Sequence, residues 1–169
     1  LYIKRDDATG TVYGGNKIRK LGFLLAQARE SGAKEVITFG GAGSNHALAT
    51  ALCARTLGMR TSLILGPQHN SHAVRANLRA GLASGAALHG CEWQNTPLLA
   101  ASLFFEAWKR DGIPPCVIPA GGSSPLGILG YLNAAYELHQ QIAEGRLPTP
   151  DLIYVASGTM GTCVGLAIG

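Results

Sequence analysis

The lysine at position 17 stands in a setting that suits covalent chemistry. Lys17 follows Gly14 and Gly15 and opens a predicted helix. A helix N-terminus carries partial positive charge, which disfavours a cation there unless something compensates. A lysine in a desolvated, electropositive pocket loses its proton more easily and becomes an amine nucleophile, which is the chemistry of Schiff-base lysines. The alternative is a solvated surface lysine, the usual state of this residue type.

Three polar residues, Ser44, Asn45 and His46, follow a glycine turn at the end of a predicted buried strand over residues 36–39. Ligands of open parallel sheets bind at the carboxyl ends of strands, and the free N–H groups of a helix start attract anions. The turn lacks the dinucleotide-binding pattern, because His46 occupies the third glycine position. The alternative is an ordinary strand-to-helix turn in which Ser44 or Asn45 only caps the helix.

A second glycine turn, residues 157–162, also joins a predicted strand to a predicted helix. Its backbone N–H groups favour an anion-binding nest, and three of its side chains are hydroxyls that donate to a phosphate. The turn contains no lysine, so it is not a P-loop and no nucleoside triphosphate is expected. The alternative is a plain connecting turn. The candidate phosphate site consists of Ser157, Gly158, Thr159, Met160, Gly161 and Thr162.

Other polar residues carry weaker signals. The turn over residues 121–124 is typical of a glycine turn with a helix cap. Arg19 and Lys20 are interpreted as surface or structural residues. Four scattered histidines show no spacing typical of a metal site, so no metal is predicted: His69, His72, His89 and His139.

The elements that must position these residues alternate along the chain. Predicted strands cover residues 1–7, 36–39, 61–65, 86–89, 116–119 and 152–156. Predicted helices cover residues 17–30, 45–57, 72–84, 97–110 and 125–144, and one more follows residue 162. The apolar periodicity predicts inward faces formed by Leu98, Ala101, Phe105 and Trp108 in the fourth helix, and by Leu129, Leu132 and Tyr136 in the fifth. This alternation predicts an α/β fold with open parallel sheets and helices on both faces.

Composition limits the possible functions. With 169 residues, 47% of them hydrophobic, the chain can bury a core of its own. The net charge of +4 is scattered along the chain, which does not favour nucleic-acid binding. No apolar run is long enough to cross a membrane. The four cysteines lack zinc or disulfide spacing, which predicts reduced thiols and a cytoplasmic location. The chain starts with Leu1 and stops inside an apolar pattern, so we expect an internal fragment of a longer protein.

The order of the motifs resembles one known enzyme family. The motifs are Lys4-Arg5-Asp6-Asp7, Gly14-Gly15-Asn16-Lys17-Ile18-Arg19-Lys20-Leu21, Gly43-Ser44-Asn45-His46, Pro119-Ala120-Gly121-Gly122-Ser123-Ser124-Pro125-Leu126-Gly127 and Ser157-Gly158-Thr159-Met160-Gly161-Thr162. As an ordered set they resemble the family of 1-aminocyclopropane-1-carboxylate deaminase and D-cysteine desulfhydrase. The resemblance covers nearly the whole chain and implies pyridoxal 5'-phosphate as cofactor and the tryptophan-synthase β-like fold, called fold type II, in truncated form.

The resemblance also implies roles for single residues. Lys17 would be the Schiff-base lysine and would move protons at the substrate carbon. Asn45 would bind the ring hydroxyl of the cofactor, and residues 157–162 its phosphate. Ser44, Asn45 and His46 would hold the substrate carboxylate, and Ser44 would take part in the chemistry.

The resemblance leaves two substrates open. At the position after Ser44-Asn45 this chain has His46, which resembles the D-cysteine desulfhydrases, whereas the cyclopropane deaminases usually carry glutamine there. Gly43 departs from the glutamine that the family commonly has at this position. We therefore expect a lyase that releases sulfide, pyruvate and ammonia from D-cysteine by β-elimination. The alternatives are a 1-aminocyclopropane-1-carboxylate deaminase and a non-catalytic module that binds a phosphorylated metabolite.

The expected organisation follows the same resemblance. Residues 1–30 would belong to a large cofactor domain, residues 31–146 would form a small α/β domain, and residues 147–169 would begin the rest of the large domain. The resemblance implies a homodimer for the full-length protein. The expected partner is a small amino-acid substrate, with no nucleic acid and no membrane.

Overall fold

The computed structural model describes all 169 residues and contains a four-stranded parallel sheet. The strands are β1 (Glu35–Gly41), β2 (Arg60–Gly66), β3 (Ala87–Gly90) and β4 (Cys116–Ile118), in the order β3-β2-β1-β4. β1 pairs in parallel with both β2 and β4. The chain therefore moves from β1 toward one edge of the sheet and returns on the other side of β1.

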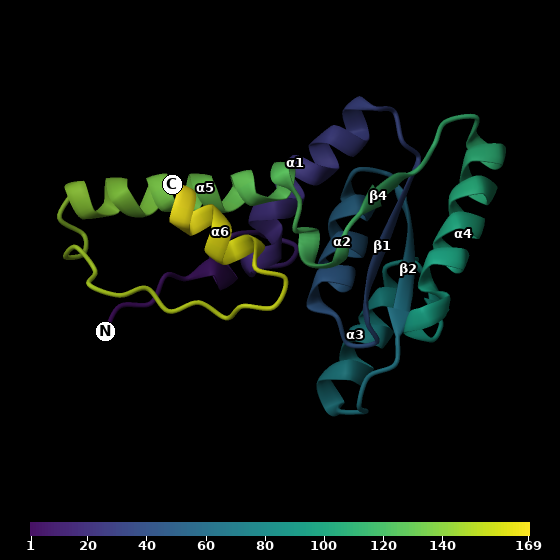
Figure 1. The fold of residues 1–169 in the computed structure, drawn as a ribbon, viewed down its shortest axis with the longest axis horizontal. Coiled ribbons are helices and arrows are strands. Elements are labelled where there is room, and N and C mark those ends of the chain that lie inside the picture. Colours follow the sequence, from purple (N-terminus) through teal and green to yellow (C-terminus); the bar gives the residue numbers. More distant parts are fainter.

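Helices cover both faces of this sheet, which confirms the predicted α/β class. α2 (Asn45–Thr56) and α3 (His72–Ala83) follow β1 and β2, and α4 (Thr96–Asp111) precedes β4. α2 and α4 each contact β1 and β2, and they lie on opposite sides of the sheet (Figure 1). Each strand is thus connected to the next strand in the sequence by a helical crossover, as parallel pairing requires.

The remaining helices pack beside the sheet. α1 (Asn16–Glu30) contacts both α2 and α5 (Pro125–Ala143), and α5 packs along α6 (Gly161–Ile168) (Figure 1). The predicted apolar face of α1 is confirmed, since all four of its members are buried: Leu21, Leu24, Leu25 and Ala28. They form one core cluster with residues of β1, α2 and β4. α1 is therefore the element that joins the sheet to α5 and α6.

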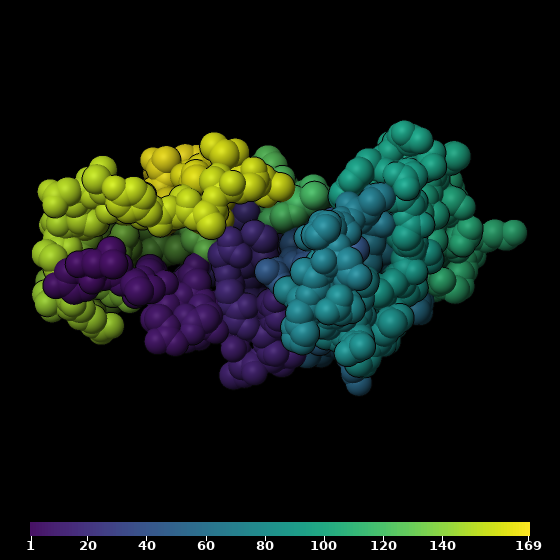
Figure 2. All heavy atoms as spheres, turned by 90° about the horizontal axis from the view of Figure 1, so that it is seen from below, coloured from purple at the N-terminus to yellow at the C-terminus, as the bar shows by residue number.

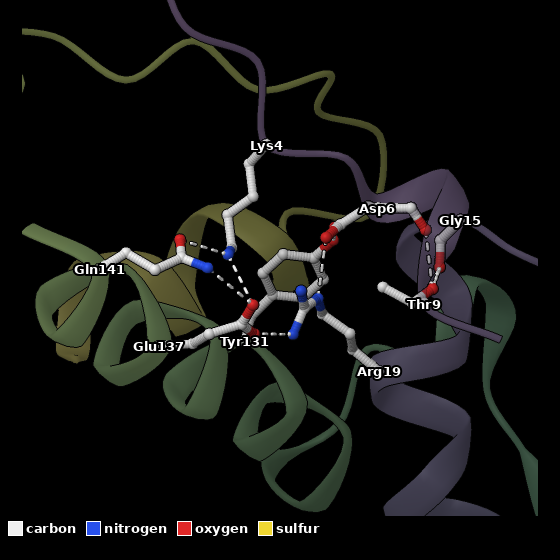
Figure 3. A network of polar contacts seen from close by, with 8 residues as sticks. All are labelled: Lys4, Asp6, Thr9, Gly15, Arg19, Tyr131, Glu137 and Gln141. Carbon is white, nitrogen blue, oxygen red and sulfur yellow. Dashed lines mark hydrogen bonds and ion pairs between the residues drawn. The ribbon is translucent and has the colours of Figure 1, made fainter. Parts of the chain in front are cut away.

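A polar network fixes the N-terminal segment to α1 and α5 (Figure 3). The Asp6 carboxylate accepts hydrogen bonds from Arg19 Nε at 2.9 Å and from the Tyr131 hydroxyl. Glu137 accepts from Arg19 Nη1 at 2.7 Å and from Lys4 Nζ at 2.8 Å. The Asp6 carbonyl accepts from Gly15 N at 2.6 Å, so the network also fixes the turn before α1. Arg19 is therefore structural, as expected.

Two predicted strands are wrong. Residues 1–7 form no strand, and a short 3-10 helix covers Asp6–Ala8 instead. Residues 152–156 also form no strand, and Tyr154 is 86% exposed. Space-filling atoms show both segments on the part of the surface that lies away from the sheet (Figure 2). An apolar, β-branched stretch becomes a strand only where another strand pairs with it, and neither segment has such a partner here.

The inward faces predicted for α4 and α5 are also wrong. In α4, Phe105 and Trp108 are exposed and stack on each other with centroids 6.4 Å apart, whereas Ala107 is buried. In α5, Tyr136 is exposed and Tyr131 is buried. Both helices are apolar on more than one side, so periodicity alone did not identify the face that packs.

The end of the sheet opposite the predicted site is held by a buried carboxylate. Glu35 accepts a hydrogen bond from Ser62 Oγ at 2.7 Å, and its other oxygen contacts Arg110 and, at 3.5 Å, Arg60 Nε. Asp111 completes the network by pairing with the same two arginines. The group links β1 and β2 to the end of α4.

We expect Glu35→Ala to lower the free energy of unfolding by about 1–3 kcal/mol, because a buried hydroxyl and two arginines lose their acceptor. Glu30→Ala removes an exposed carboxylate without such partners and should change it by no more than about 0.5 kcal/mol. Urea unfolding of the complete natural protein measures both. Equal effects of the two variants would contradict the structural role of Glu35.

The division into domains at residues 31 and 147 stays a prediction. None of the helices combines the length and apolar composition that a membrane span requires. No cluster of three or more histidine, cysteine or acidic side chains is arranged to hold a metal ion.

Candidate functional site

The candidate site lies where the direction of the strand order changes. β1 and β4 are neighbours, but the chain moves from β1 to β2 and β3 on one side and then places β4 on the other side of β1, so the strand order reverses between β1 and β4. Ligands of open α/β sheets bind outside the carboxyl ends of strands at such a point. Residues 41–46 follow β1 and residues 119–124 follow β4. A Cβ on Gly122 would lie 3.4 Å from His46 Cε1 and 3.5 Å from Lys20 Cβ, so the two loops and α1 meet there.

Lys17 is the second residue of α1, and the first turn of this helix holds no acidic residue. Gly15, the N-cap, has φ of 112°, which glycine adopts without strain. Burial lowers the pKa of the Lys17 amine below its usual range. Its positive charge in turn lowers the pKa of Lys20 and of His46. Lys20 follows Lys17 by three residues, so the two lysines share one face of α1. This is the environment that turns a lysine into an amine nucleophile.

The start of α2 offers free backbone donors. Ser44 is the N-cap, and its Oγ accepts from Ala47 N at 3.2 Å. The first helical residues, Asn45 and His46, have N–H groups with no acceptor inside the helix. Two adjacent N–H groups at the positive end of a helix suit a carboxylate. The predicted group of Ser44, Asn45 and His46 is therefore brought together by the helix start itself.

The His46 side chain turns away from these donors into the core. The imidazole is only 3% exposed, and Nε2 lies 3.0 Å from Thr38 Oγ1. Thr38 donates its hydrogen to the Ile118 carbonyl at 2.9 Å, so the histidine Nε2–H is the donor to Thr38. Burial, and then the charges of Lys17 and Lys20, lower the pKa of His46 to about 4. The sequence predicts that the His46 side chain contacts the substrate, but the structure shows the imidazole buried against Thr38. The neutral ring therefore packs under the first turn of α2, below the two free N–H groups.

Lys20 is a site residue that the sequence analysis missed. Its side chain is 1% exposed, and Nζ donates to the Gly121 carbonyl at 3.3 Å and to Ser123 Oγ at 3.2 Å. No carboxylate pairs with it. Burial first, and then the charge of Lys17, lower the pKa of Lys20 to about 8. A buried amine without a counterion is costly unless an anion joins it.

Residues 157–162 contribute only part of the predicted phosphate site. Thr159 Oγ1 lies 2.7 Å from Ser123 Oγ, and a Cβ on Gly161 would lie 2.6 Å from Lys20 Nζ. Thr162 is buried in the first turn of α6. The Ser157 hydroxyl donates to the sulfur of Met160 at 2.9 Å rather than to a group near Lys20. Three predicted members of the phosphate site are exposed and form no hydrogen bond with Lys20: Ser157, Gly158 and Met160.

The groups gathered around Lys20 suit an anion such as a phosphate. They are one amine, the hydroxyls of Ser123 and Thr159, and the N–H groups of Thr162 and Cys163 in the first turn of α6, which have no acceptor inside that helix. The Gly161 N–H already donates to the Thr159 carbonyl at 2.8 Å. None of these groups is acidic. The backbone of Gly161 approaches so closely that any larger residue would fill the space between Lys20 and Ser123. We call Lys20, Ser123, Thr159 and the start of α6 the anion cradle.

An amine nucleophile beside an anion cradle is the arrangement that a phosphorylated aldehyde cofactor requires. The whole chain, residues 1–169, matches the family described as pyridoxal-phosphate dependent enzyme. The chain belongs to the pyridoxal-phosphate dependent enzyme family. The resemblance inferred from the ordered motifs is thereby confirmed, and pyridoxal 5'-phosphate is the cofactor of the family.

Relatives in this family carry two different names. A protein of Pyrococcus horikoshii named "Putative 1-aminocyclopropane-1-carboxylate deaminase" is 41% identical over 171 residues, which cover 100% of this chain and 50% of that protein. D-cysteine desulfhydrase of Salmonella choleraesuis is 38% identical over 173 residues, which cover 100% of this chain and 52% of that protein. The chain thus spans about half the length of the curated relatives that it matches.

Solved structures of the family share the fold. The crystal structure of an ACC deaminase homologue superposes with a TM-score of 0.79 at 38% identity, over 98% of this chain and 50% of that one. A pyridoxal 5'-phosphate-dependent aspartate racemase superposes with a TM-score of 0.70 at 22% identity, over 98% of this chain and 45% of that one. The fold type II class predicted from the motifs is confirmed.

The cradle predicts how binding of the family's cofactor depends on pH. A bound phosphate favours protonated Lys20, whose pKa without ligand is about 8. Binding then takes up a proton above pH 8, so affinity should fall as pH rises, by up to about tenfold per pH unit. Pyridoxine 5'-phosphate is the probe, because it lacks the aldehyde and cannot bond to Lys17.

Titration calorimetry of the Lys17→Ala variant between pH 7 and pH 11 measures this slope without interference from the second amine. Because the Lys17 charge lowers the pKa of Lys20, removing it raises that pKa, and affinity in this variant should begin to fall at a higher pH than in the unchanged protein. After Lys20→Met is added to the same variant, affinity should no longer fall because of a lysine in the cradle. An affinity that falls nowhere in this pH range while Lys20 is present would contradict the assignment.

Proposed function

We propose that the complete natural protein containing this chain is a pyridoxal-phosphate-dependent lyase that acts on a small amino acid, with D-cysteine as its substrate. One observation carries the proposal. The anion cradle around Lys20 lies against the start of α2, where Gly122 approaches both Lys20 and His46, and Lys17 precedes Lys20 by three residues on the same face of α1. An amine for the cofactor aldehyde, donors for a carboxylate and a phosphate site are the three parts that this chemistry needs.

The bound cofactor would supply an electron-withdrawing ring that makes the α-hydrogen of an attached amino acid acidic. The residues of this chain divide the other tasks. Lys17 Nζ would hold the cofactor through its aldehyde and would move the proton at the substrate α-carbon. Asn45 would donate to the ring oxygen. The cradle would hold the phosphate through Lys20, Ser123 and Thr159.

The substrate carboxylate is held at the start of α2. The N–H groups of Asn45 and His46 donate to it, and the Ser44 hydroxyl keeps its own hydrogen free because its oxygen accepts from Ala47 N. With the carboxylate fixed there, the α-carbon is presented to Lys17. D-cysteine and one water would then give pyruvate, ammonia and sulfide.

The relatives support a second substrate, 1-aminocyclopropane-1-carboxylate, because the Pyrococcus horikoshii relative carries that name at 41% identity. Sulfide release from D-cysteine is measured against 2-oxobutanoate release from the cyclopropane acid, with the complete natural protein. Faster sulfide release supports the proposal. Faster 2-oxobutanoate release would show that the substrate is 1-aminocyclopropane-1-carboxylate, while the enzyme class stays as proposed. A protein that never forms a borohydride-sensitive cofactor band would be a phosphometabolite-binding module.

We expect His46→Gln to change the ratio of the two reactions by at least about tenfold. The imidazole is hydrogen-bonded to Thr38 and packs under the N–H groups that would hold the substrate carboxylate. A different side chain at position 46 would therefore shift the first turn of α2. Parallel rate measurements on both substrates give the ratio. Thr38→Val serves as the control, because it keeps the imidazole and removes the hydroxyl that joins it to the Ile118 carbonyl. An unaltered ratio in His46→Gln would show that position 46 does not select the substrate.

The homodimer that the resemblance implies and the cytoplasmic location inferred from the cysteines stay predictions.

A further inference from the structure

The loop between β1 and α2 is held by two side chains that the cofactor assignments do not use. Gly43 N donates to Gln68 Oε1 at 2.8 Å, and the Gly43 carbonyl accepts from Asn77 Nδ2 at 2.9 Å. Both partners come from elsewhere in the chain, Gln68 from the segment after β2 and Asn77 from α3. Val74, one turn before Asn77, packs so closely that a Cβ on Gly43 would lie 2.6 Å from its Cγ2. α3 therefore fixes the position of this loop.

Asn77 also contacts Asn45, the residue that we propose binds the ring oxygen of the cofactor. Its Nδ2 donates to Asn45 Oδ1 at 2.8 Å, and the Tyr13 hydroxyl donates to the same oxygen at 3.4 Å. Both hydrogens of Asn77 Nδ2 are thus used, one on Gly43 and one on Asn45. The Asn45 side chain is exposed, and its own Nδ2 has no partner in the protein.

The direction of these hydrogen bonds follows from one fixed group. The Gly43 carbonyl can only accept, so the end of the Asn77 amide that faces it must be the NH₂ end. The same NH₂ group faces Asn45, so the Asn45 side chain must accept this hydrogen bond with its oxygen. The Asn45 amide is therefore turned so that its NH₂ group remains free. A side-chain amide is otherwise symmetric in shape and adopts either orientation.

We propose that Asn77 is a positioning residue that orients the Asn45 amide, so that Asn45 offers a hydrogen-bond donor rather than an acceptor to the cofactor ring oxygen. This rests on the proposed function. A donor at that oxygen stabilises its ionised form, whereas an acceptor stabilises the protonated hydroxyl. Asn77 would set this choice from α3 without touching the cofactor.

The decisive variant is Asn77→Asp, whose carboxylate accepts and does not donate. Asn45 then turns its NH₂ group toward position 77 and its oxygen toward the ring. The pH midpoint of the visible absorbance band of the bound cofactor should rise by at least one pH unit. Gln68→Glu is the matched control, because it adds the same charge to the same loop while keeping the acceptor for Gly43 N. A midpoint that moves equally in both variants would overturn the proposal.

Two further variants separate orientation from general damage. In an Asn45→Ala background, Asn77→Asp should no longer shift the midpoint, since no amide remains to be turned. Asn77→Ala removes the constraint without adding charge and should give a smaller rise, because the Tyr13 hydroxyl still donates to Asn45. A full shift that persists without the Asn45 amide contradicts the proposal.

A measurement without cofactor keeps this proposal distinct from the proposed function. In NMR of the complete natural protein labelled with ¹⁵N-asparagine, both Nδ2 protons of Asn45 should show the temperature dependence of protons exposed to water. Asn77→Asp should make one of them hydrogen-bonded. Asn45 protons that are already hydrogen-bonded in the unchanged protein would refute the role of Asn77, whatever the cofactor spectrum shows. If that orientation holds but no cofactor band ever forms, the proposed function fails instead.

Discussion

Lys17→Ala should abolish the visible absorbance band of the bound cofactor and reduce turnover at least about a thousandfold, because the nucleophilic amine acts at more than one step. The amine forms the bond to the cofactor and then moves the substrate proton. No other amine can replace it, since Lys20 is already hydrogen-bonded within the anion cradle. Absorbance spectra and steady-state rates of the complete natural protein measure both effects.

The matched control is Lys109→Ala, which removes an exposed lysine of α4 on the side of the sheet away from α2. It should leave spectrum and rate unchanged. Because the cradle is intact in Lys17→Ala, that variant should still bind pyridoxine 5'-phosphate. Loss of this binding together with the band would indicate misfolding rather than a missing nucleophile, and a band that survives in Lys17→Ala would refute the assignment.

Lys20→Met should weaken binding of pyridoxine 5'-phosphate by about 10- to 150-fold, the loss of one hydrogen bond to a charged group. Without ligand, the same change should stabilise the protein or leave it unaltered. It replaces a buried cation that lacks a counterion with an apolar side chain of similar size. Affinity and stability are thus expected to change in opposite directions, which a purely structural lysine would not produce.

Calorimetry with the phosphorylated probe and thermal unfolding without it test this pair of results. Lys4→Met is the control, because Lys4 donates to Glu137 and Gln141 outside the cradle. That variant should retain affinity for the probe. If Lys20→Met lowers stability and leaves affinity unchanged, Lys20 supports the fold and holds no phosphate.

Much of the fold follows from local sequence signals. Strands β1 to β4 and helices α1 to α6 occur where apolar patterns and glycine stops predict them, because each is bounded by its own caps and turns. Ser44 and Ser124 cap helices through their hydroxyls, in the two turns where the sequence predicts a cap, and Ser71 caps α3 in the same way. The turn after β1 was recognised for the same reason.

Features that depend on distant partners could not be predicted. Residues 152–156 have the composition of a strand, but no strand pairs with them in this chain. Phe105 and Trp108 share a helix face that periodicity marks as apolar, yet the sheet packs on Ala107. Which side of an apolar helix becomes buried is decided by the neighbouring layer, which single-helix periodicity does not contain.

The site shows the same division. Lys17 was predicted from the glycines before it, and its role stays a prediction. Lys20 was missed, although residues three apart share one face of a helix and that spacing was a usable signal. His46 was read as a side chain that faces the ligand, but the first turn of α2 points it inward. Asn77 lies 32 positions from Asn45, and no local pattern connects the two.

The central claim is that Lys17 Nζ bonds covalently to pyridoxal 5'-phosphate. The most direct test treats the complete natural protein with pyridoxal 5'-phosphate and then borohydride, digests it, and locates the modified lysine by mass spectrometry. We expect the reduced adduct on Lys17 at about one per chain, with Lys20 unmodified. An adduct on Lys20 or on scattered surface lysines, with Lys17 free, would contradict the account.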